Sequence, residues 1–154
     1  MEELRAYFFV NMYLSGIHAG IQAQHCTAEM FARYDKARPD EKKVLHDWAN
    51  EHKTTILLNA GYQSELHKIT ALLINSGYPW AVFGESVEAL NGATTCSGVI
   101  LPKKMYSYRL WKDTPEEALD IGSYEYRTED GILWSYSLEE LELIYKMSKL
   151  KLMT

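Results

Sequence analysis

The stretch that decides the fold reads Gly16-Ile-His-Ala-Gly-Ile-Gln-Ala-Gln-His-Cys-Thr-Ala-Glu-Met-Phe-Ala-Arg-Tyr34. An apolar run over residues 6–14 precedes it and is typical of a buried strand. The glycines at 16 and 20 predict an exposed turn, which opens into a helix from Gly20 to about Lys36. A strand, a turn and a helix in this order aim backbone N–H groups and a helix N-terminus at one point. The sequence therefore predicts an anion or phosphate site at this turn.

Length and composition indicate one folded domain. The chain has 154 residues, of which 47% are hydrophobic, and this is enough to bury a core. We expect residues 1–154 to form a single α/β domain, with a core over 1–102 and an extension over 103–154. No apolar run is long enough to span a membrane, and the first residues lack the pattern of a signal peptide. A cytoplasmic protein without a membrane partner is expected.

The charge and the cysteine content of the chain limit the kinds of ligand that are expected. The formal net charge is −5, whereas proteins that grip long nucleic acids usually present a basic surface. The balance favours a small ligand or a protein partner. Cys26 and Cys96 are expected to be reduced thiols, and no Cys/His spacing indicates a metal site. No cofactor is predicted.

Hydrophobic periodicity predicts alternating strands and helices up to Pro102. The order β-α-α-β-α-β-β is typical of an α/β fold with some parallel strand pairs. We therefore expect a mixed four-stranded sheet flanked by helices. The expected strands are residues 6–14, 54–58, 80–83 and 96–101, and the expected helices are residues 20–36, 40–52 and 64–75.

The segment after Pro102 has a different character. Alternation over residues 106–111 suggests a strand, and Thr114 followed by proline predicts a helix start. An Asp-Gly turn between residues 124–127 and 132–136 predicts a β-hairpin. Ser137 and Glu140 form a capping box that opens a last amphipathic helix, expected to reach about Leu152. The apolar stripe of this helix and the many tyrosines predict a homo-oligomer, at least a dimer.

Over roughly residues 6–102 the chain resembles the type II peptidyl-tRNA hydrolase family. The resemblance is carried by the strand before Gly16, the helix opening Gly20-Ile-Gln-Ala-Gln-His-Cys-Thr-Ala28, the segment Phe83-Gly-Glu85, and the strand that ends at Pro102. It implies that family's fold, with the C-terminal hairpin and helix added, and a dimer. The opening segment also resembles uncharacterised proteins of large tailed phages.

The resemblance also points to individual residues. Gln24 stands at the family's glutamine in an Ala-Ala-Gln helix, Thr95 or Thr94 at its threonine, and Glu85 near its acidic residue after the third strand. Gln22 and Gln24 lie two positions apart on the expected helix, so either one can face a ligand while the other contacts the sheet.

One residue of the family pattern is missing. The family has a lysine in the turn before the helix, and the resemblance assigns it to RNA phosphate contact or to hydrolysis. The equivalent residues 15–20 contain no lysine or arginine, and His18 is their only ionisable side chain. We therefore expect a binding site without assigned catalytic residues. Its predicted residues are Gly16, His18, Gly20, Gln22, Gln24, Glu85, Thr94 and Thr95.

Three functions remain open on these grounds. The first hypothesis is non-catalytic sequestration of a nucleotide or small phosphate ligand, such as a host signalling nucleotide captured in the host cytoplasm by a phage protein. The alternative is a peptidyl-tRNA hydrolase acting on tRNA, with Lys103, Lys104 or His18 as a substitute cation. The third is a module that binds another protein. Glu85 and Glu88 are a further candidate carboxylate pair.

Overall fold

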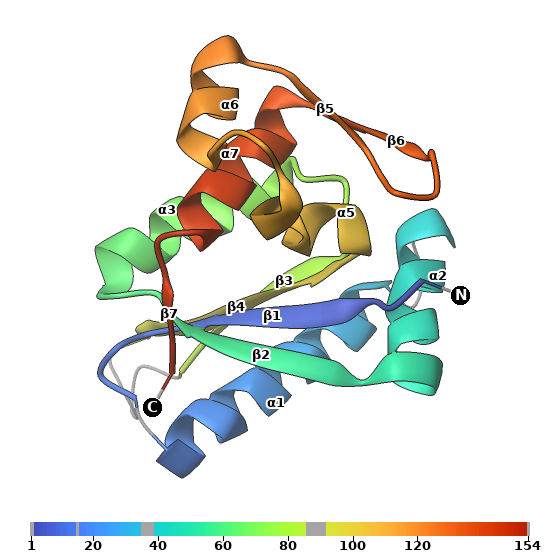
Figure 1. Cartoon of the computed structure of the whole chain (residues 1–154). Coiled ribbons are helices and arrows are strands. Elements are labelled where there is room, and N and C mark those ends of the chain that lie inside the picture. The colour runs from blue at the N-terminus through green and yellow to red at the C-terminus, as the bar shows by residue number, and fades with distance from the viewer. Residues whose placement is uncertain (1, 15, 35–38, 86–91, 154) are drawn as a thin grey trace.

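A mixed five-stranded sheet lies at the centre of the structure (Figure 1), in the order β3–β4–β1–β2–β7. The structure is a computed structural model that describes residues 2–14, 16–34, 39–85 and 92–153. β1 and β2 are parallel, and the other neighbouring strands are antiparallel. The strands are β1 (Arg5–Val10), β2 (Thr54–Asn59), β3 (Trp80–Gly84), β4 (Thr94–Leu101) and β7 (Lys151–Leu152).

Helices cover both faces of this sheet because the central strands bury both of their faces. In β1, Phe8 points into a core with α1 (Gly16–Tyr34) and α2 (Pro39–Asp47), which continues as a π-helical turn over Trp48–His52. Phe9 points into the opposite core, with α3 (Gln63–Ile74) and α7 (Leu138–Met147). The alternation follows from the two-residue period of a strand.

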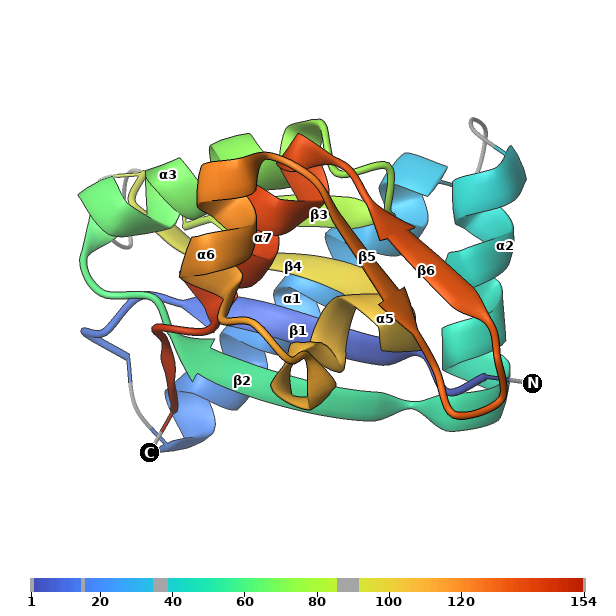
Figure 2. The same cartoon turned by 45° about the horizontal axis from the view of Figure 1, so that its top comes forward.

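The extension adds a group of aromatic side chains to the core on the α3 side of the sheet. Trp111 lies with its ring centroid 4.4 Å from that of Tyr124 and 4.8 Å from that of Tyr136. Figure 2 shows α6, α7 and the β5–β6 hairpin on the same side of the sheet as α3. The elements are α5 (Lys103–Tyr106), a 3₁₀ turn (Tyr108–Leu110), α6 (Pro115–Ile121), β5 (Tyr124–Arg127) and β6 (Leu133–Tyr136).

The predicted fold class is confirmed, as are the start signals of two helices in the extension. Thr114 accepts a hydrogen bond from the N–H of Glu117, with Pro115 in the first turn. Ser137 and Glu140 form the reciprocal capping box at the start of α7. No helix among the described residues is long and apolar enough to cross a membrane.

Three predicted elements were wrong. The last helix ends at Met147 and not at Leu152, and residues 151–152 pair with β2, so the sheet has five strands and not four. Residues 106–111 are helical turns and not a strand. There Tyr108 and Trp111, three positions apart, bring their rings together, which is the spacing of a 3₁₀ turn. β1 stops at Val10 because the Asn11 side chain accepts the N–H of Tyr13 and turns the chain.

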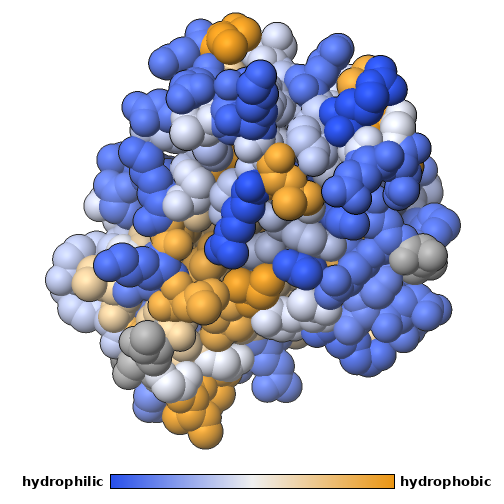
Figure 3. Space-filling model, viewed as in Figure 1, coloured by the Kyte–Doolittle hydropathy of each residue, from blue (hydrophilic) through white to orange (hydrophobic). Residues whose placement is uncertain are grey.

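The predicted homo-oligomer is untested. Part of the apolar stripe that suggested it is buried within the chain, whereas Leu138 and Leu152 are exposed. The stripe of α7 is buried against the sheet through Leu141, Leu143, Ile144 and Met147. An apolar surface remains elsewhere. Figure 3 shows hydrophobic side chains gathered over β2 and β7, at the open edge of the sheet, where Leu152 is 66% exposed.

Gly98 sets how closely α1 packs on the sheet. A Cβ at this position would lie 2.7 Å from the ring of Phe8 and 3.3 Å from Sγ of Cys26. Gly98→Ala should lower the free energy of unfolding by about 1–3 kcal/mol, because neither neighbour can move without disturbing the core. Urea denaturation measures this. Gly20→Ala is the control, since its Cβ would meet no atom within 4 Å; it should be neutral or slightly stabilising.

A polar cluster around Glu140 ties the extension to the core. Tyr78 Oη donates to Glu140 Oε2 at 2.6 Å, and Lys104 Nζ lies 2.9 Å from the same oxygen. Burial alone would raise the pKa of Glu140. The hydrogen bonds from Tyr78, the Ser137 N–H and Lys104 outweigh that effect and lower the pKa.

This cluster predicts a pH dependence of stability. Since the pKa of folded Glu140 lies below its ordinary value of 4.5, its contribution is present above pH 4.5 and is lost as the pH falls below it. Glu140→Gln should lower the free energy of unfolding by about 1–2 kcal/mol at pH 7. The difference between wild type and variant should shrink toward pH 3, as measured by urea denaturation across that range. A constant difference would contradict the role given to the charge.

Candidate active site

Three polar side chains from separate elements meet at one end of the sheet. The Thr95 hydroxyl, on β4, donates to Gln22 Oε1 at 2.7 Å, and Gln22 Nε2, on α1, donates to Glu85 Oε1 at 2.8 Å. Glu85 follows β3 directly. We call Gln22, Glu85 and Thr95 the polar triad. Gln22 and Thr95 are buried and Glu85 is about one fifth exposed, at 21%, so the triad is ordered but open to solvent at its carboxylate.

A β-bulge aims Thr95 at α1. Phe83 pairs with Cys96 and Gly84 pairs with Thr94, so Thr95 is the extra residue between these two pairs. In a regular strand Thr95 would share a face with Val99, which packs on the α3 side. The bulge turns its hydroxyl to Gln22 on the opposite side. Thr94, in contrast, places its hydroxyl 3.1 Å from Nε2 of His67 on α3.

Two histidines lie around the triad. The ring of His25 packs on Phe83, with centroids 4.8 Å apart, and its Nδ1 is 4.0 Å from Glu85 Oε1. That Nδ1 is buried and has no hydrogen-bond partner among the described residues. His67 was missed by the sequence analysis. Its contact with Thr94 joins positions 27 apart, and only the tertiary structure brings them together; Gln63, one helical turn earlier, accepts the N–H of Thr94 in the same way.

The glycine-bracketed turn is corrected to a helix. Residues 16–20 form the first turn of α1, which begins at Gly16 and not at Gly20. Gly16 takes a left-handed φ of 52°, which glycine adopts without strain. Gly16, His18 and Gly20 are all exposed. The predicted anion site is therefore a helix N-terminus with one histidine on it.

The other predicted site residues divide into those that belong to the triad and those that lie outside it. Gln22 contacts the sheet, while Gln24 is exposed on the outer side of α1, so Gln22 and not Gln24 joins Thr95 and Glu85. Thr94 lies at the rim beside the triad. Glu88 lies outside the described residues.

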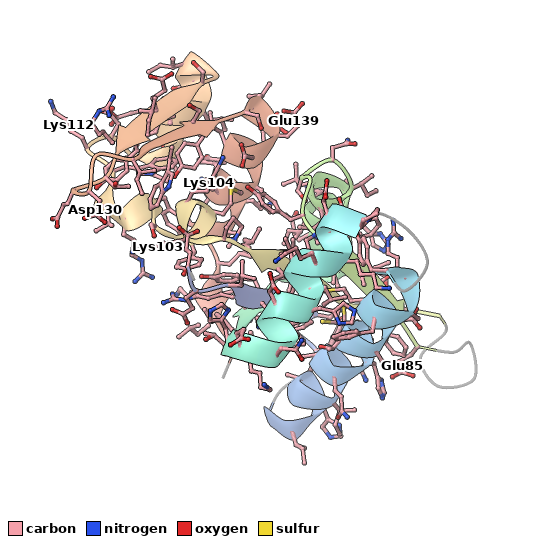
Figure 4. All side chains as sticks on the ribbon, turned by 90° about the vertical axis from the view of Figure 1, so that its right-hand side faces the viewer. Glu85, Lys103, Lys104, Lys112, Asp130 and Glu139 are labelled. Atoms are coloured by element: carbon pink, nitrogen blue, oxygen red, sulfur yellow. The ribbon has the colours of Figure 1, made fainter. Side chains whose placement is uncertain are left out.

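The lysines suggested as substitute cations lie at the wrong end of β4. Lys103 and Lys104 follow its C-terminal end, whereas Thr95 is at its start, roughly 25 Å away along the strand. Figure 4 shows both lysines on the side of the extension and Glu85 beside α1. Lys104 is also committed to Glu140 and to the carbonyl of Ser135. Of the three residues suggested, only His18 is placed near the triad's end of the sheet.

A comparison with protein-family models assigns the chain. The model described as peptidyl-tRNA hydrolase PTH2 matches residues 4–107, which is more than half of the 154 residues and includes the whole triad. The chain belongs to the PTH2 family. A search of curated proteins finds no match.

This membership corrects the first functional hypothesis. Sequestration of a nucleotide by a non-catalytic phage protein was wrong: the match is to a family named for a hydrolase, and nothing found supports sequestration. The absent turn lysine does not exclude the family, because the match includes the residues that lack it. The match favours the alternative, peptidyl-tRNA hydrolysis.

The triad predicts different effects for the two glutamines. Gln22→Ala removes the acceptor of the Thr95 hydroxyl and a donor to Glu85, and should lower the free energy of unfolding by about 1–3 kcal/mol. Gln24→Ala changes an exposed position on the same helix and should stay within about 0.5 kcal/mol of wild type. Urea denaturation of both variants decides the matter. Equal losses would mean that the triad is not held as described.

Proposed function

We propose that the chain hydrolyses the ester bond that joins the peptide to tRNA in peptidyl-tRNA, at the polar triad. The observation that carries the proposal is the hydrogen-bonded chain Thr95–Gln22–Glu85 inside the segment that matches the PTH2 family. A buried amide that is fixed on one side by a hydroxyl and on the other by a carboxylate is a preorganised polar group.

Ester hydrolysis needs a base for the attacking water, a donor for the developing oxyanion and a proton for the leaving ribose oxygen. Glu85 is the base in this proposal, because its carboxylate is held by Gln22 and is still 21% exposed to water. His25, whose Nδ1 lies 4.0 Å from Glu85 Oε1, is the group that relays the proton.

Gln22 is the proposed donor to the substrate. Its Oε1 accepts from Thr95, and one N–H of its Nε2 points to Glu85. The amide carries a second N–H on the same nitrogen, which is available for the ester carbonyl as negative charge develops there. Thr95 acts through Gln22 and is a positioning residue.

The start of α1 is the proposed contact for a phosphate of the tRNA. Its first N–H groups lack partners within the helix, and they lie at the positive end of the helix dipole. His18 is exposed on that turn and takes the place of the missing lysine. Residues 15–20 contain no lysine or arginine, so this end of the substrate needs further contacts.

The test is multiple-turnover release of the peptide from an N-acetylated aminoacyl-tRNA. Wild type should turn over, and Glu85→Gln should lower kcat by about 10²- to 10⁴-fold, the usual worth of a general base. Gln24→Ala is the matched control and should keep full activity, because Gln24 is exposed away from the triad. Absence of turnover by the folded wild type would overturn the proposal, as would full activity of Glu85→Gln.

A further inference from the structure

Two exposed tyrosines are in contact at the same end of the sheet as the polar triad. Tyr13 follows β1 and is 80% exposed, and Tyr62 precedes α3 and is 52% exposed. Their ring centroids are 5.1 Å apart. Side chains 49 positions apart in the sequence thus present a joint aromatic surface, and flat apolar surfaces of this kind stack on other rings.

Backbone hydrogen bonds hold this aromatic pair in place. The N–H of Met12 donates to the carbonyl of Gly61 at 2.8 Å, which joins the two tyrosine-bearing loops. The Asn11 side chain accepts the N–H of Tyr13 at 3.1 Å, and the Asn11 N–H donates to the carbonyl of Thr95 at 2.9 Å. The pair is therefore preorganised and tied directly to the strand that carries the triad.

Lysines of the extension lie on the other side of the same loops. A hollow of about 310 Å³ is lined by Lys146, Lys149 and Lys151, together with Met12 and Gly61. Lys146 belongs to α7 and Lys151 to β7, and Lys149 lies between these two elements. Figure 1 shows β7, the start of α3 and the loop after β1 at one end of the sheet. We call these three side chains the lysine rim.

The charge of this hollow is positive although the chain carries a net charge of −5. Glu65 is the carboxylate in its lining, and it is shared by Lys146 at 2.9 Å and Lys68 at 3.0 Å, which lower its pKa. Lys149 lies over the ring of Tyr145, 4.4 Å from its centroid, and also interacts electrostatically with Glu116 of α6. The lining of the hollow thus carries three lysines and one carboxylate, which leaves an excess of positive charge.

We propose that the lysine rim and the Tyr13–Tyr62 pair bind the single-stranded 3′ end of an RNA, the part of peptidyl-tRNA that carries the ester. The lysines contact its phosphates, and Tyr13, the more exposed of the two tyrosines, stacks on a base. Cations that follow the backbone beside aromatic rings that accept bases are the means by which proteins hold single strands. The identity of the RNA rests on the proposed function.

The proposal also accounts for the absence of a lysine or arginine at the start of α1. The family match ends at residue 107, so the lysine rim comes from a part of the chain outside it. The extension thereby supplies phosphate contacts that residues 15–20, with His18 alone, lack.

The test uses an uncharged RNA hairpin with a four-nucleotide single-stranded 3′ end, bound to the full chain and followed by fluorescence anisotropy at several salt concentrations. Lys149→Ala/Lys151→Ala should weaken binding and reduce the slope of log K against log salt by about 1.4, because each single-strand phosphate contact contributes about 0.7. Lys103→Ala/Lys112→Ala removes the same charge on the side of the extension that Figure 4 shows away from Glu85, and should leave the slope unchanged.

The tyrosine gives an independent signature. Tyr13→Ala should weaken binding by about 5- to 150-fold, the usual loss for one stacked base, without changing the salt slope. Tyr13→Phe keeps the ring and should bind as wild type. A blunt hairpin of the same stem should bind more weakly than the hairpin with the 3′ end.

Equal slopes for the two double-lysine variants, or equal binding of blunt and overhanging hairpins, would overturn the proposal. Because the hairpin carries no ester, binding is measured whether or not the chain hydrolyses peptidyl-tRNA. Turnover with unchanged slopes therefore removes this inference alone. Loss of slope in the Lys149/Lys151 variant without any turnover removes the proposed hydrolysis and keeps the RNA surface.

Discussion

The whole structure depends on the burial of β1 on both of its faces. Ala6, Phe8 and Val10 enter the core with α1, and Tyr7 and Phe9 enter the core with α3 and α7. β1 also pairs with β2 on one edge and β4 on the other. Both edges and both faces of β1 are in contact with other elements, so its neighbours can vary little in volume. Gly98 of β4 is an example, because it pairs with Phe8 and leaves room for the ring of that residue.

The end of β1 determines where the polar groups meet. At Asn11 the chain leaves the sheet, and its N–H and side chain bond to the carbonyls of Thr95 and Thr94. The same end receives the start of α1, the end of β3 and the start of β4. Buried polar groups that come to this end from three elements must form hydrogen bonds with one another, and Gln22 forms them with both Thr95 and Glu85.

The extension has two structural consequences. It closes the second face of the sheet, because α7 packs on the face of β1 that bears Tyr7 and Phe9, and the hydrogen bond from Tyr78 to Glu140 joins it to the loop before β3. It then returns along β2 as β7, which places Lys151 at the end of the sheet that holds the triad. A segment outside the family match is thus part of the surface around the proposed site.

The sequence by itself determined what local rules control. Apolar runs predicted β1 and β4, and capping residues predicted the starts of α6 and α7, because a cap involves groups within one turn. The resemblance named the residue types of the site. Only the tertiary structure decided the fifth strand, since two residues form a strand only when β2 offers them partners. It also decided between Gln22 and Gln24, because the rotation of α1 about its axis is fixed by packing on the sheet. Thr95 reaches Gln22 through a bulge between β3 and β4, and a register shift between two strands leaves no mark in either strand's own sequence.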